Sequence, residues 1–247
     1  RDTVLAAVNQ NYDVKNKVIL QLCPEARARE SNFETVAKLK NEFSNSFLKF
    51  MVSEHPANME GEIVGKGGNV VWAAERLCEE LGRLKIDFER VMITTMDADS
   101  IMEKEYLAHL SYLYLINHDR DNASYEPLAF YTNNIWDAPA PMRILAVGNS
   151  FYTLLQASRP HLQRNFSSHS QSLSSLLVTN FWSKKTIVED GHQYWRSYMA
   201  FKGRYRVESM FVPNCQDAVL GLNYRDTLKA QFIQLRRWAY GVSDIPY

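Results

Sequence analysis

The chain has 247 residues, 46% of them hydrophobic, which is enough for one large domain or two small domains with a sizeable core. Lysine and arginine together number 28, as do aspartate and glutamate, and this zero net charge excludes the basic class of nucleic-acid-binding proteins. The cysteines, Cys23, Cys78 and Cys215, are odd in number and too far apart for a zinc cluster, so we expect a reducing compartment.

The start of the chain indicates a piece of a longer protein. The sequence begins Arg1-Asp2-Thr3, with no initiator methionine and no signal-peptide pattern. No uncharged apolar stretch approaches the roughly 20 residues that a membrane-spanning helix needs.

Strand and helix patterns alternate in the first half of the chain. Short apolar runs at residues 18–22, 48–52 and 91–95 predict strands. Between them, apolar residues recur at helical spacing over residues 33–47 and 70–81. This order predicts an α/β fold with a mostly parallel central sheet flanked by helices. In such sheets, ligands bind at the carboxyl ends of the strands.

The second half is less regular. Residues 117–171 give no clear pattern, because prolines interrupt a sequence rich in aromatic residues and asparagine. Regular patterning resumes at residues 172–179, and we then expect a helix at 191–201, a strand at 207–212 and a final helix at 226–240.

Two carboxylates follow the strand expected at residues 91–95. Asp97 and Asp99 are separated by one residue, so both can reach one site if the chain turns there. Such a pair suits a divalent cation that shares its ligand shell with substrate phosphates. That cation would neutralise the charge on a diphosphate leaving group. The competing interpretation is a solvated turn or a helix cap.

A second acidic pair, Glu189 and Asp190, precedes the helix expected at 191–201. Asp190 can be a cap for that helix. Alternatively, it is a general base that removes a proton from an acceptor hydroxyl. One such carboxylate is sufficient for a single in-line displacement at an anomeric carbon, which inverts the configuration there.

The final helix carries a polar and aromatic group. Gln234, Arg237 and Trp238 are spaced to share one face of the helix. Arg237 can hold a diphosphate through several hydrogen bonds, and Trp238 offers a flat surface to a sugar ring. In the alternative interpretation, the helix is basic and amphipathic and packs through Phe232 and Leu235.

A glycine-rich turn, Gly65-Lys66-Gly67-Gly68-Asn69, lies at the expected start of a helix. It does not match the phosphate-loop pattern, because the spacing from Gly61 is one residue short and glycine replaces the required serine or threonine. The turn can still direct Lys66 and backbone N–H groups at a phosphate. A plain loop leading into the helix is the alternative.

Taken together and in this order, these segments resemble glycosyltransferase family 2, and within it the branch of polysaccharide synthases. That branch carries a glycine–lysine–glycine segment, a D-x-D pair, an E-D pair and a Q-x-x-R-W motif, and the matches here extend from about Asn9 to Trp238. The resemblance implies the GT-A fold, a Rossmann-like nucleotide-diphospho-sugar transferase fold with a mostly parallel sheet. It further implies that residues 1–247 are a single catalytic domain, lacking the first strand and the flanking membrane segments of the family.

The resemblance also implies roles for the motif residues. It assigns the catalytic base to Asp190 and the metal, Mg²⁺ or Mn²⁺, to Asp99. It assigns nucleotide-sugar binding to Lys66, Asp97, Asp99 and Arg237. The donor and acceptor side would be lined by Glu189, Gln234 and Trp238.

We therefore expect an inverting, metal-dependent transfer of a sugar from a nucleotide-diphosphate sugar, UDP-linked, to a growing polysaccharide or lipid-linked acceptor. Family members with the Q-x-x-R-W motif usually continue into membrane helices. We accordingly expect a membrane partner through segments outside this chain, with the catalytic domain on the cytoplasmic face. The aromatic and apolar residues 130–152 either lie on a membrane surface or form a buried insertion.

Two alternatives remain open. One is a non-processive transferase that makes a glycolipid or a lipid-phosphate sugar. The other is a non-catalytic, nucleotide-sugar-binding or regulatory module. The family usually ends its next strand in an aspartate that contacts the nucleotide, whereas Cys23, Pro24 and Glu25 follow the apolar run here. Glu25 either replaces that contact or the contact is missing, and its loss would favour the module.

Overall fold

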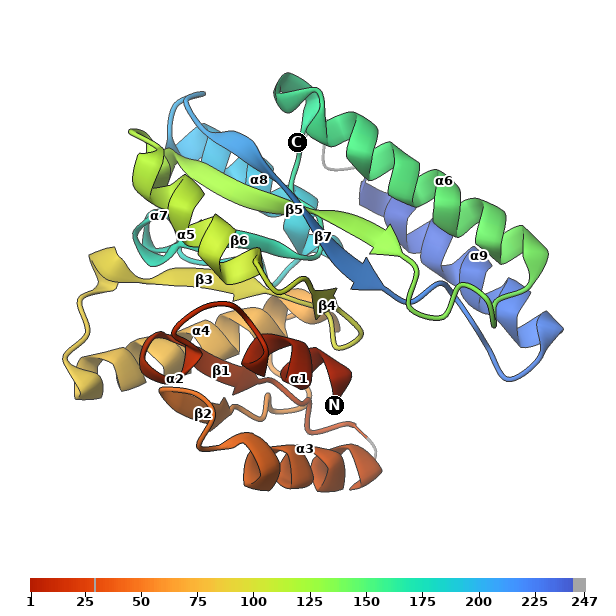
Figure 1. Ribbon diagram of the computed structural model, residues 1–247, viewed down its shortest axis with the longest axis horizontal. Coiled ribbons are helices and arrows are strands. Elements are labelled where there is room, and N and C mark those ends of the chain that lie inside the picture. Colours follow the sequence, from red (N-terminus) through yellow and green to blue (C-terminus); the bar gives the residue numbers. More distant parts are fainter. Residues whose placement is uncertain (29, 242–247) are drawn as a thin grey trace.

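The computed structural model describes residues 1–28 and 30–241 of the chain (Figure 1). Helices and strands alternate in the first part, with all three expected strands present. The elements are α1 (Asp2–Val8), α2 (Val14–Lys17), β1 (Ile19–Leu22), α3 (Glu30–Phe43), β2 (Lys49–Val52), α4 (Lys66–Leu84) and β3 (Met92–Thr95). A short 3₁₀ helix, Phe88–Arg90, leads into β3.

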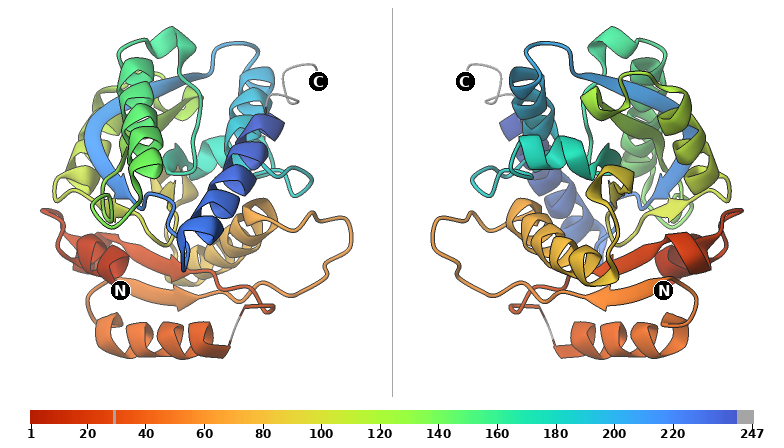
Figure 2. Two further views of the ribbon diagram at one scale, coloured as in Figure 1. Left: turned by 90° about the vertical axis from the view of Figure 1, so that its right-hand side faces the viewer. Right: turned by 90° about the vertical axis from the view of Figure 1, so that its left-hand side faces the viewer.

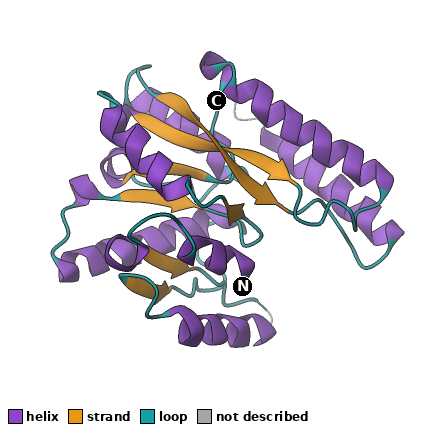
Figure 3. Cartoon of the chain, viewed as in Figure 1, coloured by secondary structure: helices purple, strands orange, loops and turns teal. Residues whose placement is uncertain are grey.

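The second part contains the longest strands and two long helices (Figure 3). Its elements are β4 (Ile101–Met102), α5 (Tyr106–Ile116), β5 (Ala123–Tyr131), α6 (Ala140–Ala157), β6 (His169–Ser172), α7 (Leu173–Val178), α8 (Glu189–Ala200), β7 (Arg206–Gln216) and α9 (Tyr224–Tyr240). Two further 3₁₀ helices span Arg120–Asn122 and Pro160–Leu162.

The main sheet differs from the one expected, and the prediction of a mostly parallel, Rossmann-like GT-A sheet is wrong. Its five strands have the order β3-β6-β5-β7-β4 and curve into a half-barrel. β3 with β6, β6 with β5, and β7 with β4 pair antiparallel, and β5 with β7 is the parallel pair among them. β1 and β2 do pair in parallel, but they form a separate two-stranded sheet.

The reason for this difference lies in strands that carry no apolar signal. β6 has the sequence His-Ser-Gln-Ser, and all four of its residues are buried. It enters between β3 and β5 and runs antiparallel to both. β5 holds Pro127, and its register with β7 shifts between Glu126 and Leu128. Proline has no N–H to donate to a neighbouring strand, so Pro127 explains the position of this register shift.

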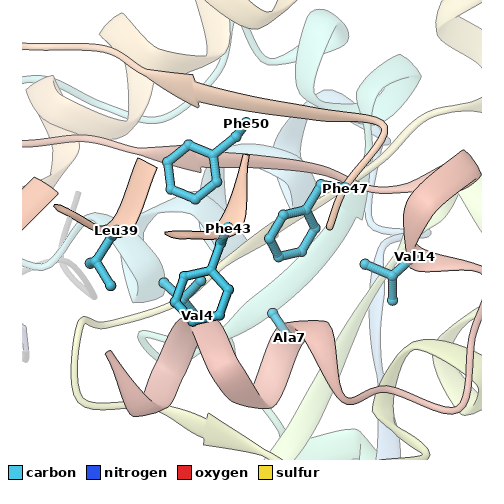
Figure 4. Packing of buried hydrophobic residues seen from close by; sticks show 7 residues of the cluster. All are labelled: Val4, Ala7, Val14, Leu39, Phe43, Phe47 and Phe50. Carbon is cyan, nitrogen blue, oxygen red and sulfur yellow. The ribbon is translucent and has the colours of Figure 1, made fainter. Parts of the chain in front are cut away.

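Separate apolar clusters hold the layers together. Residues of α1, α3 and β2, with Val14 and Phe47, form a cluster beside the small sheet (Figure 4). Its buried members are Val4, Ala7, Val14, Leu39, Phe43, Phe47 and Phe50. A second cluster joins α4 to α7 and includes partly buried Ile19 of β1 and Ile93 of β3. The two sheets are therefore joined through the side chains of α4.

The long helices α6 and α9 lie on one side of the main sheet (Figure 2, left). α6 packs on β5 through Met142, Ala146, Thr153 and Ala157. Within α9, only Thr227 and Gln231 are buried. Among the described residues, no helix is both long and apolar enough to cross a bilayer.

Candidate functional site

Segments far apart in sequence meet beside the end of β3. The ammonium group of Lys66, at the start of α4, donates a hydrogen bond to Asp97 Oδ1 at 2.7 Å. A Cβ atom on Gly67 would lie 2.3 Å from the carbonyl oxygen of Ser183 and 3.3 Å from Glu189 Cβ. The start of α4 is therefore packed directly against the segment that begins α8, an approach that only glycine permits.

Lys66 and Asp97 form the centre of this site. Lys66 Nζ also donates to the carbonyl oxygen of Ser167 at 2.7 Å, so two acceptors fix its position. Burial alone would raise the pKa of Asp97, but Lys66, a hydrogen bond with the Ser167 side chain and the more distant charge of Arg237 lower it. Asp97 is therefore ionised at neutral pH, in the position expected of it directly after β3.

Asp99 lies in a different electrostatic environment. Its Oδ2 accepts a hydrogen bond from the backbone N–H of Asp217 at 3.3 Å. Its carbonyl oxygen accepts one from Asn133 Nδ2 at 2.8 Å, which fixes the turn. Burial raises the pKa of Asp99, and the negative charges of Asp97 and Asp217 add to that rise, while the Asp217 N–H opposes it. A cation near Asp99 would thus be favoured by three acidic side chains.

The expected metal can be compared with these oxygen atoms. Within residues 1–28 and 30–241, no three histidine, cysteine, aspartate or glutamate side chains are grouped so that they alone could hold a metal ion. Mg²⁺ commonly takes one or two protein carboxylates and completes its shell with water and substrate phosphates. Asp99 fits that type of site, because its carboxylate has no lysine or arginine partner among the described ion pairs.

Glu189 and Asp190 are the first two residues of α8. Asp190 Oδ1 accepts a hydrogen bond from the N–H of the adjacent Gly191 at 2.7 Å. The N-cap of the helix is Val188, with no side-chain capping bond, so the alternative in which Asp190 caps the helix is wrong. Burial raises the pKa of Asp190, with Gly191 and Lys66 opposing the rise and Asp97 adding to it. Burial and the neighbouring Asp190 charge raise the pKa of Glu189 to about 7. Carboxylates with raised pKa values suit general-base chemistry near neutral pH.

A buried carboxyl group that the sequence analysis missed lies behind Asp190. Glu126 of β5 is only 2% exposed, and both of its oxygens lie 3.3 Å from the backbone N–H of Phe166. Burial raises its pKa well above the ordinary value, the Asp190 charge adds to this, and Phe166 and Lys66 oppose it. Its signal in the sequence was a single acidic residue in an otherwise apolar and aromatic run.

His169 of β6 is the second residue that was missed. Its Nδ1 lies 2.7 Å from the carbonyl oxygen of Phe166, and its Nε2 lies 3.2 Å from the indole N–H of Trp182. Because the indole can only donate, Nε2 must accept and Nδ1 must carry the proton. Burial lowers the pKa of His169 to about 4, so the ring is neutral. Glu126 and His169 thus bind the two sides of Phe166, next to the carbonyl that holds Lys66.

In the structure, Gln234 and Trp238 of the Q-x-x-R-W group of α9 lie together, and Arg237 lies apart from them. Gln234 and Trp238 line a hollow of about 220 Å³, counting space open to solvent, together with Tyr131 and residues of α6. The rings of Trp238 and Tyr131 are tilted, with centroids 6.4 Å apart. The alternative in which α9 packs through Phe232 and Leu235 is wrong, because both are exposed.

Arg237 does not share the hollow with Gln234 and Trp238. Its side chain is exposed, and its charge reaches the site at longer range by lowering the pKa of Asp97. The end of α9 nevertheless lies beside the start of α8, because a Cβ on Gly241 would lie 3.4 Å from Val188 Cγ2.

The raised pKa of Tyr131 indicates that acidic residues from several segments lie around one region. Burial raises its pKa to about 12, and the charges of four carboxylates add to the rise. These carboxylates are Asp97, Asp99, Asp190 and Glu126, in decreasing order of effect. A single phenol at the end of β5 thus lies within the electrostatic influence of four carboxylates of the site, and its ring pairs with that of Trp238.

A second hollow lies where β1 and β2 end. It has about 420 Å³ of space, counting that open to solvent, and its lining includes Glu25, His55, Glu62, Gly65 and Gly68. His55 Nε2 lies 2.9 Å from Glu62 Oε2, and Glu62 also pairs with Lys184 at 3.0 Å. Because Gly65 precedes Lys66, this hollow is adjacent to the carboxylate site. Glu25, which could replace the nucleotide-contacting aspartate of the family, lies in the lining of this hollow.

Comparison with protein-family models finds no match to this chain, and comparison with curated proteins finds no matching relative.

Proposed function

We propose that this chain catalyses the inverting transfer of a sugar from a nucleotide-diphosphate sugar, UDP-linked, to a glycan or lipid-linked acceptor. The observation that supports this most is the meeting of Lys66, Asp97 and Asp190 from three distant segments. These residues belong to three of the four motifs by which the sequence resembles family 2 glycosyltransferases. The proposal depends on this arrangement and the motif order, and it requires no particular sheet topology.

Donor binding would use the cations of the site. Lys66 would turn from Asp97 toward the diphosphate, and Arg237 would add charge from the exposed end of α9. Asp99 and the donor phosphates would hold Mg²⁺ or Mn²⁺, which would stabilise the charge on the leaving diphosphate. The nucleoside would bind in the hollow lined by Glu25 and His55, next to Gly65.

Transfer itself would use Asp190 as the base. Its carboxylate takes the proton of the acceptor hydroxyl while that oxygen forms a bond to the anomeric carbon. The bond from this carbon to the diphosphate oxygen breaks, and its electron pair leaves with the nucleotide. Glu189, with its pKa of about 7, would tune the charge of Asp190. The tilted rings of Trp238 and Tyr131 would support the sugar, with Gln234 beside them.

The test is a transfer assay with candidate UDP-sugars and either Mg²⁺ or Mn²⁺, which measures UDP release and sugar incorporation. Asp190→Asn should abolish transfer while leaving donor binding intact, and Asp99→Asn should weaken the metal dependence. Asp137→Asn, at an exposed aspartate, is the matched control. Full activity in both Asp190→Asn and Asp99→Asn would reject the assigned roles.

A binding or regulatory module is the second candidate, and two observations favour it. Lys66 is already neutralised by Asp97, and Cys23-Pro24-Glu25 stands where the family has its nucleotide-contacting aspartate. Tight UDP binding in a thermal-shift assay, with no turnover of any donor, would support this candidate. If transfer does occur, the length of the product distinguishes a polysaccharide synthase from a non-processive glycolipid transferase.

The location that accompanies this proposal is the cytoplasmic face of a membrane, with a membrane partner reached through segments outside the chain. A cytoplasmic site is consistent with three free cysteines. Fractionation of the full-length protein, with protease protection of the domain in sealed vesicles, would test the location.

A further inference from the structure

The irregular segment at residues 166–168 leads into β6 beside the proposed donor site. The carbonyl oxygen of Ser167 accepts a hydrogen bond from Lys66 Nζ at 2.7 Å and a longer one from Thr95 Oγ1 at 3.3 Å. An ammonium group has three N–H donors, and Lys66 uses one on Ser167 and one on Asp97. When Lys66 turns from Asp97 to a diphosphate, Ser167 is therefore the acceptor that can stay with it.

Glu126 binds the N–H side of Phe166, directly before Ser167. Both of its carboxyl oxygens lie 3.3 Å from the backbone nitrogen of Phe166. Glu126 has no lysine or arginine partner among the described ion pairs, and its raised pKa keeps it protonated at neutral pH. A neutral carboxyl group still accepts the Phe166 N–H through its carbonyl oxygen. The contact that Glu126 supplies is thus a hydrogen bond that needs no charge.

His169 binds the opposite side of Phe166. Its Nδ1–H donates to the Phe166 carbonyl oxygen at 2.7 Å, and its Nε2 accepts from the indole N–H of Trp182 at 3.2 Å. Trp182 is itself buried among residues of α4 and α7, which anchors the imidazole to the core. Phe166 is therefore fixed on both sides of its backbone, and the position of the next carbonyl group, that of Ser167, depends on both bonds.

We propose that Glu126 and His169 are positioning residues, which bind Phe166, thereby fix the Ser167 carbonyl group, and so place the Lys66 ammonium group for the donor diphosphate. This inference rests on the proposed function, because it requires Lys66 to bind phosphate oxygens. Both residues act through Lys66, and neither contacts the substrate. A lysine that is no longer held by its acceptor loses more freedom on binding, so the donor binds more weakly.

Steady-state kinetics of sugar transfer test the role of Glu126. Glu126→Met removes the acceptor with little change in volume and should raise the KM for the donor about five- to tenfold, with kcat changed less than about twofold. Glu126→Gln keeps a carbonyl oxygen for Phe166 and should keep the donor KM within about twofold of wild type. Thr153→Val is the matched control, because it removes a buried hydrogen bond to the Ala129 carbonyl of β5 and leaves Phe166 unchanged.

Two substitutions separate the two bonds of His169. Asparagine places an amide N–H close to the position of Nδ1, so His169→Asn should keep the Phe166 bond and a donor KM within about threefold of wild type. Glutamine reaches the position of Nε2 instead, so His169→Gln should lose that bond and raise the donor KM about five- to tenfold. Thermal unfolding followed by circular dichroism shows which variants are folded, and the Glu126 variants decide if a His169 variant is unfolded.

A double-mutant cycle tests whether the effect passes through Lys66. Lys66→Met alone and Lys66→Met combined with Glu126→Met should have the same donor KM. Competitive acetylation, followed by mass spectrometry, measures the restraint on Lys66 without the reaction. Relative to exposed Lys85, Lys66 should be acetylated about threefold faster or more in Glu126→Met and His169→Gln, because its partly covered side chain is then less restrained.

Additive effects in the cycle would overturn the proposal, as would unchanged donor KM and Lys66 acetylation in both Glu126→Met and His169→Gln. An equal rise of the donor KM in Thr153→Val, or in His169→Asn and His169→Gln alike, would also overturn it, because the Phe166 bonds are then not the cause. If the wild type transfers no sugar and binds no UDP, the proposed function fails. The acetylation rates then decide by themselves whether Glu126 and His169 position Lys66.

Discussion

The ammonium group of Lys66 and the carboxylate of Asp97 form an ion pair at 2.7 Å that joins the start of α4 to the end of β3. The pair holds Asp97 ionised and leaves Lys66 close to the proposed diphosphate site. The remaining carboxylates of the site are arranged around this pair, and their pKa values are raised by burial.

Lys66→Met should raise the pKa of Asp97, because its strongest favourable charge is removed. We expect the KM for the donor to rise about tenfold or more, since one charge-assisted contact to the phosphates is lost. The free energy of unfolding should fall by only about 1 kcal/mol, because the pair is partly exposed. Lys38→Met, at an exposed lysine of α3, is the control, and an unchanged donor KM in Lys66→Met would contradict the role of Lys66.

Gly67→Ala should damage the site through packing alone. Its added methyl group would lie 2.3 Å from the Ser183 carbonyl oxygen, so α4 must move away from α8. We expect a loss of about 1–3 kcal/mol in the free energy of unfolding by urea. Gly82→Ala in the same helix has nothing within 4 Å of its new methyl group and should stabilise by roughly 0.5–1 kcal/mol. Equal effects of the two substitutions would contradict the close contact of the helices.

The raised pKa of Glu189 predicts that the free energy of unfolding falls as pH rises. Its pKa is raised from 4.5 to about 7 in the folded chain, so the folded state holds a proton that the unfolded state has released between these values. The stability contribution of Glu189 is complete below pH 4.5 and is lost as pH rises through about 7, by roughly 3 kcal/mol. Urea unfolding at a series of pH values should show a flatter profile for Glu189→Gln. Glu89→Gln, at an exposed glutamate, should keep the wild-type profile.

The lowered pKa of His169 predicts the opposite effect, a loss of stability as pH falls, over an overlapping pH range. Its pKa is lowered from 6.5 to about 4, so the unfolded state takes up a proton that the folded state excludes. Stability should therefore fall by roughly 3 kcal/mol as pH drops from 6.5 to about 4. His169→Gln should remove this fall, whereas His161→Gln at an exposed position should not. If His169→Gln still lost as much stability in acid as the wild type, a group other than His169 would cause that loss.

The elements with an apolar signal were predictable from local sequence. The runs at residues 18–22, 48–52 and 91–95 became β1, β2 and β3, and the helix expected at 226–240 became most of α9. β6 was not predictable, because all four of its buried residues are polar and no periodicity distinguishes them from a loop. The predicted strand direction in the main sheet was also wrong. Strand direction depends on pairing between segments more than 100 residues apart, such as β4 and β7.

The candidate site was predictable only where short motifs marked it. Asp97, Asp190 and Lys66 were identified from their spacing, and the structure brings them together. Glu126 and His169 were missed because each is a single polar residue whose burial arises from distant segments.

The sequence alone determined which residues carry charge and where the apolar strands β1, β2 and β3 lie, because apolar runs depend on only a few neighbouring residues. Only the tertiary structure decided which carboxylates are buried, which strands run antiparallel, and which side chains bind Phe166. Burial and desolvation depend on every segment packed around a group, so the raised pKa of Glu189 and the burial of His169 follow from contacts that no local window of sequence contains.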